Sequence, residues 1–419
     1  MFDKISGGNL YHHRRILDDG QIIFLVNSTE TGTMQGELTV SGSDAAQMDG
    51  FTGEMKDYAE AREGKDRIRL TFTLPPAGSL LLFISGSKIK GVSTAEQPGR
   101  LVPVTATSAL TVERLKDNVL MMDFCDVVTK GETTKELQVL DATDRVFRSH
   151  GFESGNPWEG LVQYNNSLLS RDTFSQGTGF TAIYRFRVEG SFDFSGMNAV
   201  IERPDIYVVK VNGLEVKRSV GQWWFDRNFG VFSIGGAVTQ GDNELSITVS
   251  PMNIYAEIEP AYITGNFSVV VEEKGWKIST PPAGYAAGSW SSQGLPFYPY
   301  GMSYTKNFDI NDPSEYYEIG LGNWTGTIAE VAVNGKSAGI IGYPPYTLNL
   351  SKFIRKGENK ISVSVIGSLK NLLGPFHNNP PKGLAISPFW RNVKGYPPGT
   401  EYQIFDYGLM DDFYLFRKE

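Results

Sequence analysis

The sequence predicts an all-β protein built as tandem antiparallel β-sandwiches. Its 419 residues include 46 Gly and 21 Pro, and 12% of the chain is aromatic. Gly and Pro separate short strands, and aromatic side chains pack well on pleated surfaces. Strand-like runs dominate, and no amphipathic helix of ten or more residues is expected. The length exceeds that of one typical core, so about two to four domains are predicted.

The first predicted domain is a small sandwich over residues 1–88. Residues 21–26 form an apolar run that ends at an Asn, and residues 67–74 alternate apolar with polar side chains. After a Pro-Pro-Ala-Gly turn, residues 79–85 form another apolar run. Such runs, bounded by turn residues, are typical of strands. Residues 89–104 are polar, contain Gly and Ser, and show no periodicity, which predicts a linker.

The rest of the chain contains an internal repeat. Three segments recur in the same order: 180–188 resembles 302–310, 206–213 resembles 328–335, and 241–249 resembles 357–365. Each copy has a strand running into Val-Asn-Gly, a turn whose residues accept positive φ. A Gly-Asp/Glu-Asn turn into a final alternating strand follows. This order predicts two jelly-roll, galactose-binding-like modules at 105–276 and 277–419.

A long loop at 371–402 distinguishes the second module from the first. It carries several aromatic residues among prolines. Loops longer than about 15 residues inside a compact domain are usually functional or disordered, and this composition favours an ordered one. The first module has its own aromatic stretch around Trp223 and Trp224.

Charge and composition exclude several function classes. The net charge of −8 argues against nucleic acid as a partner, since phosphate binding needs a basic face. No apolar run approaches the roughly 18 residues of a membrane helix, and no signal peptide follows Met1. The single cysteine, Cys125, excludes an intrachain disulfide. Its apolar surroundings, residues 119–128, predict a buried structural position within one strand.

The candidate ligand-binding residues are aromatic side chains next to planar polar groups, the combination that binds sugars. Packing in cores or between modules explains aromatic residues equally well, so both interpretations stay open. A further aromatic set is Trp290, Phe297, Tyr298 and Tyr300. The carbohydrate-binding residues predicted are Trp223, Trp224, Asp226, His377, Asn378, Phe389, Trp390 and Arg391.

No catalytic residue is predicted. Glycoside hydrolysis generally needs two facing carboxyl groups. Asp123, Asp126 and Asp226 lie near aromatic residues, but ordinary strand-edge acids explain them better. The adjacent His12 and His13 would point to opposite faces of a strand and so make a poor metal pair. No cofactor is expected. A structural calcium ion would suit a jelly roll, but no EF-hand spacing is present and no ligands are assigned.

Several motifs resemble the β-sandwich region of large bacterial glycoside hydrolases. The closest likeness is to family 106 α-L-rhamnosidases, and more loosely to the sugar-binding domain of family 2 enzymes. It rests on Trp290 with Gln293-Gly-Leu-Pro-Phe-Tyr298, on Ala332-Val-Asn-Gly335 and on Leu369-Lys-Asn-Leu-Leu-Gly-Pro-Phe-His377. In that family a (β/α)-barrel preceding such modules carries catalysis, and nothing here alternates strands with helices as a barrel must.

The resemblance implies a non-catalytic region that binds carbohydrate or flanks an active site carried elsewhere, with a catalytic barrel domain outside this chain as its partner. The chain is then not expected to be active alone. The alternative is a free-standing carbohydrate-binding accessory protein, and a complete glycosidase is the least favoured reading. The implied ligand is a plant or microbial polysaccharide or oligosaccharide. A periplasmic or extracellular location is inferred from the family likeness alone.

Overall fold

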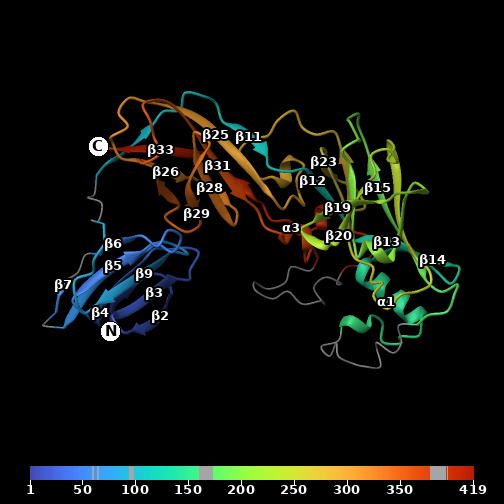
Figure 1. Ribbon diagram of the computed structural model, residues 1–419, viewed down its shortest axis with the longest axis horizontal. Coiled ribbons are helices and arrows are strands. Elements are labelled where there is room, and N and C mark those ends of the chain that lie inside the picture. The colour runs from blue at the N-terminus through green and yellow to red at the C-terminus, as the bar shows by residue number, and fades with distance from the viewer. Residues whose placement is uncertain (59–60, 64–65, 94–98, 160–172, 378–392, 394) are drawn as a thin grey trace.

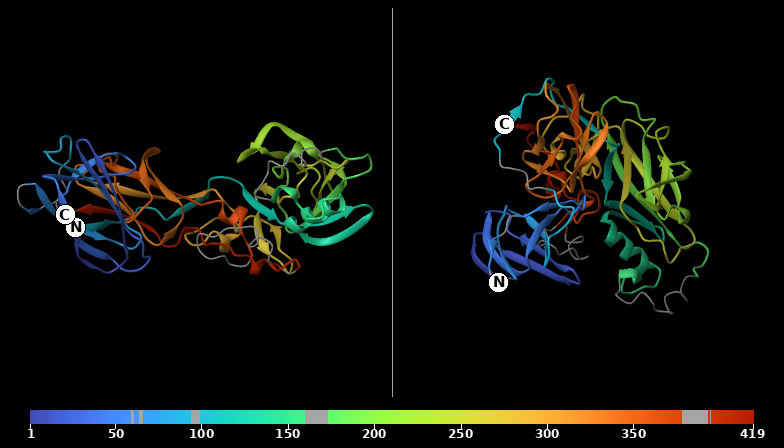
Figure 2. Two further views of the ribbon diagram at one scale, coloured as in Figure 1. Left: turned by 90° about the horizontal axis from the view of Figure 1, so that it is seen from below. Right: turned by 60° about the vertical axis from the view of Figure 1, so that its left-hand side comes forward.

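The computed structural model describes residues 1–58, 61–63, 66–93, 99–159, 173–377, 393 and 395–419. The chain forms tandem antiparallel β-sandwiches, as predicted. Figure 1 and the right panel of Figure 2 show three β-rich bodies arranged in an arc, with the sandwich that holds the C-terminus (orange) between the N-terminal sandwich (blue) and a third body (green). Helices are few in the described part of the chain, and none is long and apolar enough to cross a membrane.

The N-terminal sandwich packs a four-stranded sheet on a five-stranded one. Their facing side chains form a separate core that includes Leu25, Met34 and Leu70. The four-stranded sheet has the order β1 (Phe2–Ser6), β4 (Met34–Ser41), β8 (Arg67–Leu74) and β7 (Ala61–Arg62). The five-stranded sheet has the order β2 (Leu10–Leu17), β3 (Gly20–Asn27), β9 (Ser79–Ser85), β5 (Asp44–Met48) and β6 (Met55–Asp57).

The sandwich that contains the first copy of the repeat, called the first-copy sandwich, has the largest core. One sheet has the order β12 (Asn118–Met122), β22 (Ala261–Gly265), β16 (Asn198–Glu202), β20 (Asp226–Ser233) and β19 (Arg218–Trp224). The other has the order β14 (Glu132–Gln138), β13 (Phe124–Thr129), β15 (Phe180–Val188), β21 (Gly241–Val249), β17 (Val208–Val211) and β18 (Leu214–Glu215). The hairpin of β23 (Ser268–Val271) and β24 (Trp276–Ser279) joins it beside β15.

The second-copy sandwich combines strands that precede the first-copy sandwich in the sequence with strands that follow it. One sheet has the order β11 (Thr111–Arg114), β25 (Gly301–Ile310), β31 (Gly357–Ile366), β28 (Ile328–Val333) and β29 (Lys336–Ile341). The other has the order β10 (Leu101–Val104), β33 (Phe413–Lys418), β26 (Tyr317–Leu321) and β30 (Thr347–Asn349). A short pair joins β27 (Trp324–Thr325) to β32 (Gly408–Leu409). Single helical turns occur at Pro157–Glu159, Pro204–Ile206, Ser291–Gln293, Lys370–Leu373 and Gly399–Glu401.

The two copies share an asparagine network at the predicted turns, in which Asn243 and Asn359 are buried. In the first copy the Asn212 side chain donates to Asn243 at 2.8 Å, and in the second the Asn334 side chain donates to Asn359 at 3.0 Å. Asn243 and Asn359 each also donate to the carbonyls two and four residues before them. Asn212 and Asn334 both have positive φ, which Asn accepts more readily than most residues. The repeat is therefore a repeat of side-chain bonding as well as of strands.

The expectation of no helix of ten or more residues is wrong. Helix α1 spans 11 residues, Val139–Ser149, and packs Val139, Val146 and Phe147 into the core. Its buried side also contains polar residues, which hid the periodicity. The Thr143 hydroxyl donates to the Ile258 carbonyl at 3.0 Å and accepts from the Ile258 amide at 2.8 Å. Asp144 accepts from the Asn156 amide at 2.7 Å.

The apolar run 119–128 forms two strands and not one. Strand β12 ends before Asp123 and β13 begins after it, and the two strands belong to opposite sheets of the first-copy sandwich. The Asp123 side chain is buried at this crossover and hydrogen-bonded there. Cys125 follows in β13 and faces the core, where burial raises the pKa of its thiol. The cysteine is thus placed for packing.

Candidate functional site

A cleft of about 420 Å³ lies over the outer face of β13 and β15 in the first-copy sandwich. Side chains of β14, of the β23–β24 hairpin and of the C-terminal part of the long loop form its walls. Pockets of about 300–1,000 Å³ are the size that holds small ligands. The lining residues used below are Phe124, Asp126, Glu136, Arg185, Arg187, Asp242, Glu272, Lys274, Trp276 and Tyr396.

The alternation of β15 places the charged groups of this cleft. Tyr184 and Phe186 point into the core and are buried, whereas Ile183, Arg185 and Arg187 lie on the opposite face. Successive side chains of a strand point to opposite sides of the sheet, so the two arginines stand side by side on the outer face. In the sequence Tyr-Arg-Phe-Arg, the aromatic residues therefore pack in the core and the arginines line the cleft.

A β-bulge directs Asp126 into the cleft. The register between β13 and β14 shifts between Cys125 and Val127. Asp126 accepts from the Glu136 amide at 2.9 Å and from Nε of Arg185 at 3.0 Å, and its side chain is 5% exposed. Glu136 has φ of 56°, a strained conformation for a residue with a side chain. Bulges commonly redirect a side chain in this way.

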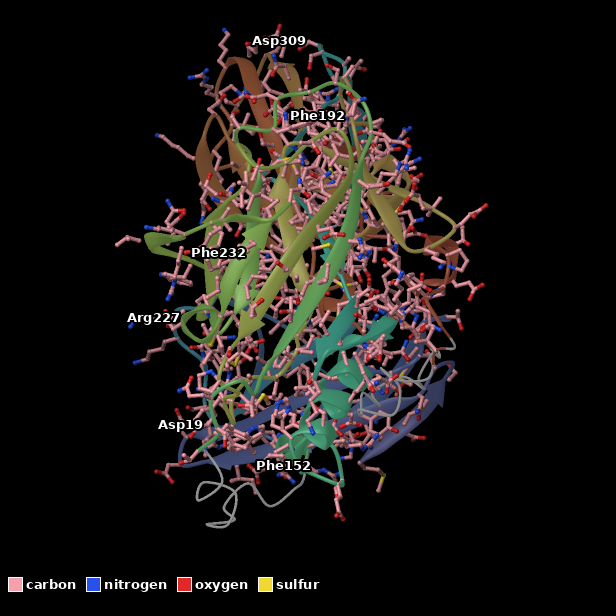
Figure 3. All side chains as sticks on the ribbon, turned by 90° about the vertical axis from the view of Figure 1, so that its right-hand side faces the viewer. Asp19, Phe152, Phe192, Arg227, Phe232 and Asp309 are labelled. Carbon is pink, nitrogen blue, oxygen red and sulfur yellow. The ribbon has the colours of Figure 1, made fainter. Side chains whose placement is uncertain are left out.

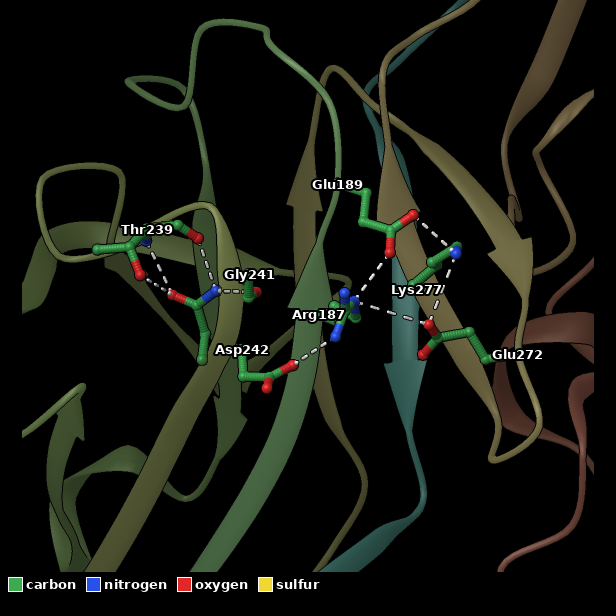
Figure 4. A network of polar contacts seen from close by, with 8 residues as sticks. Arg187, Glu189, Thr239, Gly241, Asp242, Glu272 and Lys277 are labelled. Carbon is green, nitrogen blue, oxygen red and sulfur yellow. Dashed lines mark hydrogen bonds and ion pairs between the residues drawn. The ribbon is translucent and has the colours of Figure 1, made fainter.

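Ion pairs form a ladder along the outer face, part of which Figure 4 shows. Arg187 contacts Glu189 at 2.9 Å and Asp242 at 3.3 Å. Lys277 contacts Glu189 at 2.8 Å and Glu272 at 3.6 Å. Two further ion pairs belong to this series: Arg185 with Glu244, and Lys274 with Glu136. These contacts fix planar and charged groups in a row, ready to hydrogen-bond a polar ligand.

Three aromatic rings supply the apolar part of the cleft. Phe124 and Tyr396 stack with ring centroids 4.3 Å apart, and burial followed by the charge of Asp123 raises the pKa of the Tyr396 hydroxyl. A Cβ at Gly275 would collide with that hydroxyl, so the hairpin tip needs glycine there. Trp276 packs edge-on against Phe297, and its ring Nε1 is buried without a protein hydrogen-bond partner among the described residues.

Behind the cleft, the long loop is fastened to the first-copy sandwich. The Tyr402 hydroxyl donates to Asp123 at 2.7 Å, and Nε2 of His377 lies 3.1 Å from the other oxygen of that carboxylate. The Gly275 amide donates to the Pro397 carbonyl at 2.8 Å. Loop residues beside the second copy of the repeat therefore complete a wall of the first-copy sandwich.

The sequence-predicted site residues are spread over different places. Trp223 is 54% exposed on the β19–β20 hairpin. Trp224 is half-buried, and its Nε1 donates to the Tyr300 hydroxyl at 2.5 Å, while Asp226 is exposed. Arg227, beside it, projects into solvent (Figure 3). His377 is 5% exposed and bonded to Asp123. Asn378, Phe389, Trp390 and Arg391 lie outside the described residues.

Sequence reasoning missed most of the cleft. Arg185 and Arg187 alternate with core aromatics, a signal that was available in the sequence. Trp276 and Tyr396 are 120 positions apart in the numbering, and only the folded chain brings their segments together. Trp290, Phe297 and Tyr298, three of the four residues of the further aromatic set, are buried in the cores.

Metal binding has no support within the described part of the chain. No group of three or more His, Cys, Asp or Glu side chains among those residues could hold an ion. The predicted structural calcium stays a prediction. The cleft's own carboxylates already have cationic partners, an arrangement that suits fixed hydrogen bonding of ligand hydroxyls.

Comparison with known proteins finds similarity to glycoside hydrolases. No family model matches the chain. The chain is 23% identical over 260 residues to a Formosa agariphila protein named "Putative beta-glucuronidase", a match that covers 58% of this chain and 20% of that protein. A rhamnosidase from Novosphingobium sp. PP1Y is 14% identical, with a TM-score of 0.42, and the match covers 100% of this chain and 25% of that one.

A Streptomyces avermitilis α-L-rhamnosidase complexed with L-rhamnose is also similar. It is 11% identical with a TM-score of 0.24, and the match covers 86% of this chain and 36% of that one. The chain thus spans a fifth of the curated relative it matches and a quarter to about a third of these two solved structures.

Proposed function

We propose that this chain is a non-catalytic, carbohydrate-binding β-sandwich region of a rhamnosidase-like glycoside hydrolase. The cleft over β13 and β15 is its glycan-binding site. The sequence match to the Formosa agariphila protein supports a relation to glycoside hydrolases. The fraction of that protein covered supports a role as one part of a larger enzyme, with the catalytic domain elsewhere.

The observation that carries the proposal is the union of aromatic rings and fixed charged groups in one cleft. A pyranose ring has apolar C–H faces and a rim of hydroxyls, so it suits aromatic contact on one side and directed hydrogen bonds on the other. Trp276 and Tyr396 provide rings, and Asp126, Arg185 and Arg187 provide planar polar groups.

The same geometry favours binding over hydrolysis. A glycosidase needs one carboxyl group that holds a proton at working pH. Asp126, Asp242 and Glu272 each contact an arginine or lysine instead. Each described carboxyl group that lines this cleft has a cationic partner, so none of them is set apart as an acid.

Calorimetry with neutral oligosaccharides, rhamnose-containing ones included, tests the binding site. Trp276→Ala should weaken binding at least about tenfold, or about 1.4 kcal/mol. Because Trp276 also packs on Phe297, Arg185→Gln serves as a second variant with little packing to lose. A thermal melt of each variant checks folding. Unchanged affinity in two folded variants would remove the site from this cleft.

Hydrolysis of a panel of aryl glycosides, α-L-rhamnoside and β-glucuronide included, tests the absence of catalysis. No turnover above buffer is expected from the purified chain. Turnover abolished by one Asp or Glu substitution would overturn the non-catalytic assignment. The mass of the native protein in its source separates a region of a larger enzyme from a free-standing binding protein.

A further inference from the structure

A second cleft, of about 380 Å³, opens at the edge of the N-terminal sandwich. It lies between β2, the edge strand of one sheet, and β4 and β8 of the other. His12, Arg14 and Arg67 line it, together with the core side chains Ile23 and Leu38. No Asp or Glu is among the described residues that line it. The cleft therefore has an apolar floor and a cationic rim.

This charge is notable because the chain as a whole carries a net charge of −8. Seven arginines elsewhere in the described structure form ion pairs with carboxylates, as Arg185 does with Asp126. Neither Arg14 nor Arg67 has a carboxylate partner among the described residues, although Arg69 on the same strand pairs with Glu63. Two guanidinium groups without counter-ions are thus concentrated in one cleft.

Arg14 is held in position by a buried amide. Its Nε donates to the Gln21 side chain at 2.6 Å, and that side chain donates in turn to the Ser41 carbonyl at 2.6 Å. Gln21 is 6% exposed and links the two sheets. A bond at Nε leaves the terminal guanidinium nitrogens for a ligand, and guanidinium groups bind oxyanions with paired hydrogen bonds.

We propose that this cleft binds an oxyanion, carboxylate or sulfate, carried on a saccharide. The inference rests on the proposed carbohydrate-binding function, but it assigns a separate site with a different chemistry. The apolar floor suits the C–H face of a sugar ring, and Arg14 and Arg67 suit its acidic substituent. The first cleft, whose charges are paired internally, suits neutral parts of a glycan.

The competing explanation is protection of a sheet edge. Inward-pointing charges on an edge strand prevent two sheets from joining, and β2 is such a strand. Under that explanation, loss of Arg14 changes association of the protein and leaves ligand binding unaltered. The two explanations therefore predict different measurements.

The test measures binding of three probes by calorimetry: oligogalacturonate, dextran sulfate of defined length, and inorganic sulfate. Unsulfated dextran is the neutral control. We expect at least one acidic saccharide to bind at least tenfold more tightly than unsulfated dextran and inorganic sulfate. Arg14→Gln and Arg67→Gln should each weaken that binding at least fivefold. Arg15→Gln, the same charge change on the outward face of β2, should leave it unchanged.

Several outcomes would overturn the inference. Equal loss in Arg15→Gln would mean a diffuse charge effect, and inorganic sulfate binding as tightly as the saccharides would mean a simple anion site. Unchanged binding with new oligomers in Arg14→Gln would establish edge protection. Trp276→Ala separates the two proposals, because it should weaken neutral glycan binding and leave the acidic probes on the N-terminal sandwich unaffected.

Discussion

The two copies of the repeat share one internal framework and present different outer faces. Both hold their turns through the paired asparagines, and both pair the first strand of the repeat with the last over its full length. On the outer face of the first copy β15 carries Arg185 and Arg187. The corresponding positions of β25 in the second copy carry Asn307 and Asp309. The framework fixes the fold, and the outward positions are free to take up a function.

The largest expected effect comes from substitutions that disrupt the asparagine network shared by the two copies. Asn243→Ala and Asn359→Ala each remove a buried amide that makes four or more hydrogen bonds. Each should lower the free energy of unfolding of its sandwich by about 2–4 kcal/mol, because backbone groups of the turn lose their partners. Urea denaturation followed by hydrogen exchange of β21 and β31 measures the two losses. If the two variants lost strongly unequal free energies of unfolding, the two networks would be alike only in geometry.

The second effect compares glycan binding by the outer faces of the two copies. Arg185→Gln should weaken neutral glycan binding by about tenfold, whereas Asn307→Ala, at the corresponding position of the second copy, should leave it within twofold. Asn307→Ala should change stability little, whereas Arg185→Gln also removes the cation beside the buried Asp126 carboxylate, so a thermal melt accompanies the binding measurement. Calorimetry on the two variants decides the comparison. Equal losses would place the glycan on both copies.

A third effect concerns pH and belongs to the first-copy sandwich. Burial raises the pKa of Glu259 to about 8 from an ordinary 4.5, and the charges of Glu202 and Glu257 add to the increase. The folded state then binds more protons than the unfolded state between these values. The free energy of unfolding should therefore decrease as pH rises through this window, by up to about 1.4 kcal/mol per pH unit.

Glu259→Gln removes this ionisation and should flatten the decrease. Denaturation midpoints at pH 5 and pH 8 measure it, with Glu330→Gln on the exposed face of β28 as the matched control in the second copy. A pH dependence that persists unchanged in Glu259→Gln would assign it to other groups.

The smallest effect is expected at the exposed hairpin of β19 and β20. Trp223→Ala should change the free energy of unfolding by no more than about 0.5 kcal/mol, since over half of the side chain is exposed. Glycan affinity in the cleft should also be unchanged. A loss of affinity in this variant would support the sequence-based prediction of Trp223 as a sugar contact.

The sequence predicted individual strands well, but it did not predict which residues come together in the cleft. Residues 67–74 and 79–85 were predicted as strands and form β8 and β9, because alternation and turn residues are local signals. Helix α1 was missed because its buried side includes Thr143 and Asp144, whose hydrogen bonds are long-range. The cleft was missed for the same reason, since Tyr396 reaches Phe124 only after the sandwiches form. The predicted module boundaries stay predictions.

The attachment of the long loop to the first-copy sandwich has a consequence for dissecting the protein. Phe376 and Tyr402 are part of the first-copy core, although residues 280–366, which include β25 and β31, separate them from the strands of that core. A fragment ending before residue 277 would lack both rings and would leave Asp123 without Tyr402. The two sandwiches should consequently unfold as one cooperative unit, and gene truncation between the copies would yield an insoluble product, where the symmetry of the repeat alone suggests two separable halves.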